Sequence, residues 1–441
     1  MRAAPAIAIA AAAALASSAA AAPPPTARKV TLAEAIALAT RDNIQIVVGK
    51  EKVVSASEKV ESTRTRRLPS LSLRGNAFVW NEPIEIQFPG MAGMPPQTLT
   101  VRDQITASVE VTVNQPITSA IVLGRLIDLD QAGVVASRAE LDQHQLDLAY
   151  QTAEAYVGGL QAQTLRAIAD TSVTQVEASL TRARVLVQGG VLGDVDLLRL
   201  EATRDRMRQQ ALEAEVAAES ATRGLALLLG LPDGTDLELV DLDAAAPELS
   251  WSEAQAVAAA RRQRPEARVA AARAEQASLG IAVARAAYLP NVSAFATYSH
   301  NEGQGAFGAK DAGFVGVSLD WNLWDWGRRG VEVDQARSAR RQADALQAFT
   351  ADQIALDARL KWLRASTARK TLDVSASGLR AAEEAYRLQS VRFAQGAATT
   401  TDVIDAESEV ARARAQATIA RYQYVVAWMA LARAVGESPR R

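Results

Sequence analysis

Four segments of the chain alternate apolar and polar residues with a period of two. The alternation is clearest at 104–114 and 314–323, and the segments 71–79 and 292–300 keep it more loosely. About ten residues of such alternation is the length of a β-strand that crosses a membrane. The pattern therefore predicts four membrane-crossing strands, and a soluble antiparallel sheet is the competing interpretation.

Two long stretches without proline follow the strands, at 125–187 and 328–394. At 1.5 Å per residue, helices of some 60 residues reach roughly 90 Å. That length favours a coiled coil or a tunnel wall over a compact domain. A glycine-containing turn follows each stretch, and second helices are expected at 195–229 and 402–435. Each long stretch therefore predicts one helical hairpin.

Helical stretches of moderate length precede each pair of strands, at about 32–65 and 251–287. Pro265 is expected to divide the second into two helices, because proline is tolerated in a first turn but not in a helix interior. Both stretches end at a Leu-Pro dipeptide, because the residue before a proline disfavours helix. Pro69 and Pro290 are therefore the predicted helix-to-strand transitions.

The same unit occurs twice in the chain, which is how repeat architectures are recognised. Gly190, Asp196 and Glu201 match Gly396, Asp402 and Glu407, each pair separated by 206 positions. Gly230 and Gly436 close the two copies at the same separation. The predicted organisation is a signal peptide at 1–22, a first repeat at 30–230, a linker at 231–250, a second repeat at 251–436 and a tail at 437–441.

The N-terminus has the character of a secretory signal. Arg2 is followed by an apolar run at 6–16 and by small residues at 17–22, with several Ala-x-Ala cleavage options. An Ala-rich tail is the alternative. Because the run is short of the roughly 20 strongly apolar residues that a membrane span needs, no transmembrane helix is expected.

Composition narrows the function further. The formal net charge is −2, and a nucleic-acid binder usually carries a strongly basic patch, so no nucleic acid is expected. The chain contains no cysteine and two histidines, His144 and His300, which lack a partner at metal-ligand spacing. We find no Ser/His/Asp set and no phosphate-binding loop. The sequence therefore predicts no enzyme activity, no metal and no cofactor.

Four strands per chain leave two open sheet edges, which are costly in lipid. Edge closure therefore demands an oligomer, and three chains would supply an acceptable barrel of twelve strands. Two or four protomers would also close, with eight or sixteen strands. The long helices carry many charges, which suits a water-filled tunnel better than a membrane span.

These motifs together resemble the outer-membrane efflux protein family, the TolC-like factors, over about residues 30–436. The resemblance rests on Leu-Pro before the strands, on Gly-Arg at 124–125 and 327–328, and on Gly-x5-Asp-Val-Ile-Asp-Ala at 396–406. It implies a mixed, mainly α fold in which four β-strands per protomer join a trimeric 12-strand transmembrane β-barrel. Long α-helical hairpins would continue the barrel as a periplasmic tunnel, with a mixed belt built partly from the linker and chain ends.

The resemblance also implies a location and partners. The protein would lie in the lipid of the Gram-negative outer membrane, as the passive exit duct of a tripartite efflux system. Its partners would be two other copies, a periplasmic adaptor and an inner-membrane pump of the resistance-nodulation-division, ABC or major-facilitator type. The exit duct of a type I protein-secretion system is an alternative. A coiled-coil envelope scaffold or adaptor is another, but it leaves the paired strands unexplained.

The most informative candidate residues lie where the second hairpin turns. Asp402 and Asp405 are three residues apart and so share one helix face. In a trimer each would form a ring of three carboxylates, and the resemblance places a constriction here. The alternative for Asp402 is helix capping, with Thr399 as N-cap. Asp196 is the first-copy counterpart, and its alternative is an acid that complements the helix dipole in the first turn.

The residues of both hairpin tips are expected adaptor contacts by resemblance, and a tight turn that needs glycine is the alternative. They are Gly190, Val191, Leu192 and Gly193 in the first copy, and Gly396, Ala397, Ala398 and Thr399 in the second. Some family members have an arginine two residues after the tip glycine, which helps to lock the closed state. Ala398 and Leu192 stand there instead, so the resting pore is expected to be held differently. The segments 81–102 and 301–312 are expected to be extracellular loops.

Overall fold

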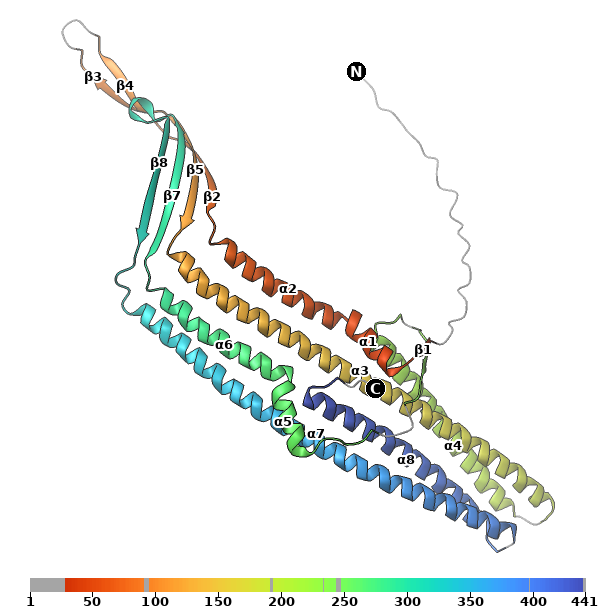
Figure 1. The fold of residues 1–441 in the computed structure, drawn as a ribbon. Helices are drawn as coiled ribbons and strands as arrows, with labels where there is room; N and C mark the ends of the chain where they lie inside the picture. The colour runs from red at the N-terminus through yellow and green to blue at the C-terminus, as the bar shows by residue number, and fades with distance from the viewer. Residues whose placement is uncertain are drawn as a thin grey trace, which may run out of the picture.

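The computed structural model describes residues 28–90, 95–190, 193–232, 234–242, 247–395 and 397–438, and the expected signal peptide lies outside them. A four-stranded sheet forms one end of the molecule, and long helices run away from it to two hairpin tips at the other end (Figure 1). Within the described part of the chain, no helix has both the length and the apolar character that a membrane crossing requires.

The main sheet is antiparallel and combines both copies in the order β2-β5-β7-β8. Its strands are β2 (Ser70–Val79), β5 (Ile105–Pro116), β7 (Asn291–Glu302) and β8 (Asp311–Asp320). In the described residues, β2 and β8 each have a strand neighbour on one side only. The chain therefore presents two open edges, as the sequence predicts.

The ladder register places most aliphatic side chains of the four strands on one face, whereas Phe78, Phe295 and Phe314 lie on the other. Leu73 lies opposite Val111, and Val113 lies opposite Ala296, which in turn faces Val315. Large side chains on this face are well exposed in the single chain: Leu71, Leu73, Val79, Ile105, Val109, Val113, Val315, Val317 and Leu319. Exposed apolar side chains along most of this face fit contact with lipid.

The opposite face of the sheet is mainly polar at its middle. Ser72, Thr112 and Thr297 lie in register across three strands, and the hydroxyl groups of Thr112 and Thr297 are 2.9 Å apart. An apolar face backed by a polar one is the pattern of a barrel with a wet interior.

Two predictions about the strands need correction. The segment 81–102, expected as a loop, contains a hairpin of β3 (Ile84–Phe88) and β4 (Gln97–Arg102) that projects beyond the sheet (Figure 1). The expected strand 314–323 begins and ends three residues earlier, as β8. Its last ladder pair joins Asp320 to Asn291, so the alternation continues past the last residue that has a partner.

The predicted helical stretch 32–65 has its expected bounds, but Asn43 divides it into α1 (Leu32–Asp42) and α2 (Ile44–Thr65), a break that the sequence analysis does not predict. The Asn43 side-chain oxygen accepts a hydrogen bond from the backbone N–H of Gln45 at 2.9 Å and so caps α2. The second copy divides as predicted, into α5 (Glu253–Gln263) and α6 (Pro265–Ala286), with Pro265 in the first turn.

Two long hairpins form the wall that runs away from the sheet (Figure 1). The first joins α3 (Ser119–Gln188) to α4 (Asp194–Leu228), and the second joins α7 (Arg328–Ala394) to α8 (Thr400–Val435). With 70 residues, α3 spans about 105 Å. The second long helix has the predicted bounds, whereas α3 begins six residues before the predicted start.

The main core lies at the waist, where the linker and the start of the described chain meet the long helices. There β1 (Arg28–Val30) pairs in parallel with β6 (Leu237–Leu239). The buried Tyr156 hydroxyl lies 2.8 Å from the carbonyl oxygens of Val30 and Val240, and burial raises the pKa of this phenol to about 12.

An ion network near the waist joins the two copies. Arg264, whose side chain is only 7% exposed, donates hydrogen bonds of 2.7 Å to both Glu266 and Asp357. Arg433 of α8 donates to Glu266 at 3.0 Å and also pairs with Asp147 of α3. This network therefore holds α3, α6, α7 and α8 in one arrangement.

Candidate functional site at the hairpin tips

Both hairpins turn at the end of the molecule that is farthest from the sheet, where their tips lie near each other (Figure 1). Gly190 follows α3 with a left-handed φ of +71°, a conformation that glycine adopts without strain. Gly193 is the N-cap residue of α4. The expected tip residues Val191, Leu192 and Gly396 lie outside the described residues.

The second tip contains a complete capping box. The backbone N–H and the hydroxyl of Thr399 both donate to Asp402 Oδ2 at 2.8 Å, and the Asp402 N–H donates to Thr399 Oγ1 at 3.2 Å. These hydrogen bonds lower the pKa of the Asp402 carboxyl, with a smaller contribution from the Arg392 charge. The capping role considered for Asp402 is therefore present, and it leaves the carboxylate ionised.

The other two candidate acids lack such a partner. Asp196 lies in the first turn of α4, and Asp405 lies in α8 with an exposed side chain. Within the part of the chain that the structure describes, neither carboxylate forms an ion pair. Near a helix N-terminus both are favoured by the helix dipole. Among the described residues, Asp196 and Asp405 are therefore both acids without an ion-pair partner, and Asp405 is the more exposed of the two.

The second tip has a cation nearby, although no arginine stands two residues after its glycine. Ala398 occupies that position, and Arg392 near the end of α7 acts on Asp402 through its charge. This cation comes from the other helix of the same hairpin. Within one chain, Arg392 therefore supplies positive charge near Asp402 although the lock motif is absent.

The two predicted transitions lie at the other end of the helices. Pro69 directly precedes β2, four residues after α2 ends, and Pro290 directly precedes β7, four residues after α6 ends. The equivalent positions of the two copies therefore change from helix to strand in the same way.

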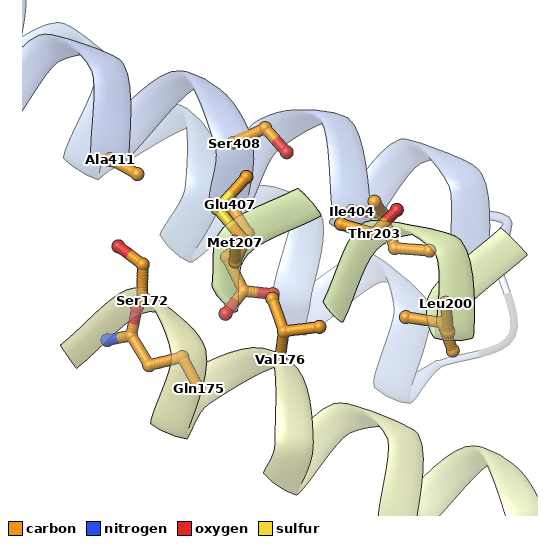
Figure 2. Close-up of a pocket in the computed structure, with 10 residues that line it drawn as sticks. All are labelled: Ser172, Gln175, Val176, Leu200, Thr203, Met207, Ile404, Glu407, Ser408 and Ala411. Carbon is orange, nitrogen blue, oxygen red and sulfur yellow. The ribbon is translucent and has the colours of Figure 1, made fainter. Parts of the chain in front are cut away.

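Beneath the tips, the two hairpins pack together through a small apolar cluster. Leu180, Ala183 and Leu200 are buried there, and Leu197 and Ile404 pack against them. Figure 2 shows side chains from α3, α4 and α8 gathered in a pocket at this place, with Glu407 among them. The tips therefore rest on a shared core and are not independent projections.

Sequence reasoning missed Glu407, which it used only to align the copies. This side chain is half-buried, and the loss of hydration raises the pKa of its carboxyl, although the Arg182 charge opposes the shift. Its first-copy counterpart Glu201 pairs with Arg184 at 3.2 Å. Alignment of the two copies could have indicated this difference. Glu407 is equivalent to Glu201, but Ser390 stands at the position equivalent to Arg184, 206 residues further on.

The fold is that of outer-membrane channels. The chain is similar to the solved outer-membrane channel OprN, with a TM-score of 0.76 and 20% identity over 92% of this chain and 90% of that one. It is also similar to the MtrE channel of Neisseria gonorrhoeae in its open state, with a TM-score of 0.76 and 19% identity over 93% and 90% of the two chains.

The sequence identifies the family as well. Residues 35–231 and 256–437 match the family described as outer membrane efflux protein, and the chain belongs to that family. The outer membrane efflux protein BepC of Brucella suis is 22% identical over 335 residues, which cover 75% of this chain and 72% of BepC.

Membership of this family confirms the predicted fold class, function and location. The protein is an efflux channel of the outer membrane, in which trimeric assembly supplies the strands that close the barrel. The helical hairpins extend from the barrel into the periplasm, and the family works with adaptor and pump partners. It is a family of channel proteins and not of enzymes.

Proposed function

We propose that the two hairpin tips form the inner gate of this efflux channel, with the carboxylates of Asp402, Asp405 and Asp196 around the constriction. The observation that carries this proposal is that all three acids lie in the first two turns of α4 and α8, at the end farthest from the lipid-facing sheet. Threefold symmetry turns each acid into a ring of three charges. Such rings attract cations and favour their passage.

The same tips are the surface that a periplasmic adaptor would contact. Gly190 and Gly193 in the first copy, and Ala397 to Thr399 in the second, are mostly exposed beyond the apolar cluster. The channel has no phosphate-binding motif in its sequence, so the energy for transport would come from an inner-membrane pump.

Single-channel conductance of the purified trimer in planar bilayers tests the gate. We expect Asp405→Asn to reduce the preference for K⁺ over Cl⁻, measured as a shift in reversal potential under a salt gradient, because it removes three charges from the constriction. Asp402→Asn is expected to give a smaller shift in the same direction. Asp373→Asn, an exposed acid on α7 far from the tips, is the matched control.

An unchanged reversal potential in Asp405→Asn would show that Asp405 does not contribute to the gate. If the unmodified trimer conducted no ions, the protein would not be a channel. The two results are separate, because the first concerns the charge at the tips and the second concerns the open path through the molecule.

A further inference from the structure

The two copies of the repeat differ at one charged contact beneath the tips. In the first copy, Arg184 of α3 forms an ion pair with Glu201 of α4 at 3.2 Å across the hairpin. The second copy keeps the acid as Glu407 but has Ser390 in place of the arginine. The Ser390 hydroxyl donates to the backbone carbonyl of Tyr386 at 2.8 Å, so it is occupied within its own helix. Glu407 has therefore lost the cation that its counterpart retains.

A cavity of about 260 Å³ is lined in part by Ser390, the residue that stands in place of the arginine. It is bounded by α7 and α8 of the second hairpin and by α3 and α4 of the first. The aromatic rings of Tyr386 and Phe393 line the cavity, together with the aliphatic side chains of Leu200 and Ile404. Glu407 is also among the lining residues. The cavity therefore combines an apolar interior with one carboxylate.

Two other ionisable side chains line this cavity. Arg182 comes from α3 and Tyr386 from α7, while α4 contributes only Leu200. Arg182 donates a hydrogen bond to Ser179 Oγ at 3.0 Å, and its influence on Glu407 is electrostatic and not a direct ion pair. Among the described residues, no hydrogen-bond donor is paired with the Glu407 carboxylate.

A half-buried carboxylate without a partner is costly, because burial removes hydration and nothing replaces it. We propose that this cavity is a binding site for the guanidinium, amidinium or ammonium group of a small organic cation that carries a compact apolar body. The cation would lie against Glu407 in the place that Arg184 occupies beside Glu201 in the first copy. Its apolar body would contact Tyr386 and Phe393, whose ring faces attract cations as well.

The size of the cavity limits the ligand. Pockets for drug-sized molecules are typically about 300–1,000 Å³, so this one suits a smaller molecule. Benzamidine is a suitable probe, because it joins a planar amidinium to a single aromatic ring. Benzamide has the same shape without the charge and serves as its neutral control.

Isothermal titration calorimetry of the detergent-solubilised trimer tests the site. We expect benzamidine to bind and benzamide to show no binding. Glu407→Gln should weaken benzamidine binding by about tenfold to a hundredfold, which is the usual contribution of a charge-assisted hydrogen bond. Glu201→Gln, the same change at the equivalent acid of the first copy, should leave binding unchanged.

Two further variants keep the test independent of any folding defect in Glu407→Gln. Arg182→Gln should strengthen benzamidine binding, because it removes the cation that repels the ligand. Ser390→Arg should abolish binding, because the new side chain fills the cavity and pairs with Glu407 as Arg184 pairs with Glu201. Gel filtration confirms that each variant is still a trimer.

Equal binding of benzamidine and benzamide, or full binding by Glu407→Gln, would overturn the site. So would the absence of benzamidine binding to the unmodified trimer. These results would not affect the proposed gate, because binding is measured without ion current and the gate variants leave Glu407 in place.

Discussion

Single polar side chains determine where several helices of this protein begin. Asn43 interrupts a continuous helical stretch because its side chain offers the next helix a hydrogen-bond acceptor. Thr399 does the same at the second hairpin tip, and there the reciprocal bonds to Asp402 complete a capping box. Asp402 caps α8 and is also a proposed pore acid. A variant that breaks the cap without removing the charge separates the two roles.

Thr399→Ala tests the structural role of the capping box without removing a charge. We expect it to destabilise the first turn of α8 by about 1 kcal/mol, because the Asp402 N–H loses its acceptor. Hydrogen exchange of the amides at 402–404 measures this local change. Thr401→Ala, two residues into the same turn, is the control, and equal protection in the two variants would show that the box contributes nothing.

The sheet is the element that ties the chain to the membrane. Its strands come from copies about 200 residues apart, yet the ladder register aligns their alternation so that one face carries most of their aliphatic side chains. A slip of one residue would turn every apolar side chain of a strand to the other face. The register is thus the property that makes four short segments into one lipid-facing surface.

Adjacent positions of β5 test which face meets lipid. Val111→Arg is expected to destabilise the trimer by about 2–4 kcal/mol per chain, because it places a charge at mid-depth in the bilayer. Thr112→Arg, on the opposite face, should be tolerated because that face lines the wet interior. Urea unfolding in lipid vesicles gives the difference, and a greater loss in Thr112→Arg would reverse the assignment of the faces.

At the scale of the whole molecule, the two copies are held together by buried charge as well as by apolar contacts. Burial opposes ionisation of Glu266, but hydrogen bonds and charge from Arg264 outweigh it and lower the pKa of this carboxyl. The stability that this interaction contributes is therefore present above the ordinary pKa of 4.5. It is lost as the pH falls through the lowered value in the folded protein.

Arg264→Met tests the network. We expect it to destabilise the protein by about 3 kcal/mol near pH 7, because Glu266 and Asp357 lose a shared cation in a buried place. The difference from the unmodified protein should shrink as the pH falls below 4.5, since Glu266 then becomes protonated in the variant. Thermal unfolding at several pH values measures both effects.

Arg268→Met provides the matched control for the network. It breaks an exposed ion pair with Asp142 of 2.9 Å, whose loss should cost less than about 1 kcal/mol. A similar loss in the two arginine variants would show that burial of Arg264 has no special effect.

The sequence predicted features that depend on long, regular patterns. The second long helix has its predicted bounds, and Pro265 marks the break that its chemistry requires. The hairpin of β3 and β4 was missed because each strand is short, and the pair of β1 and β6 involves three residues on each side. The isolation of Glu407 depends on which side chains three helices bring together, and only the alignment of the two copies could have indicated it.

The open margins of β2 and β8 have a genetic consequence. A mutant subunit that is blocked at one margin can still join a normal neighbour through the other, and the ring it enters then fails to close. If normal and mutant alleles are expressed equally and subunits mix at random, only about one trimer in eight contains three normal subunits and closes. Such an allele would be dominant, so that a cell with an intact second gene would still lose most of its export capacity.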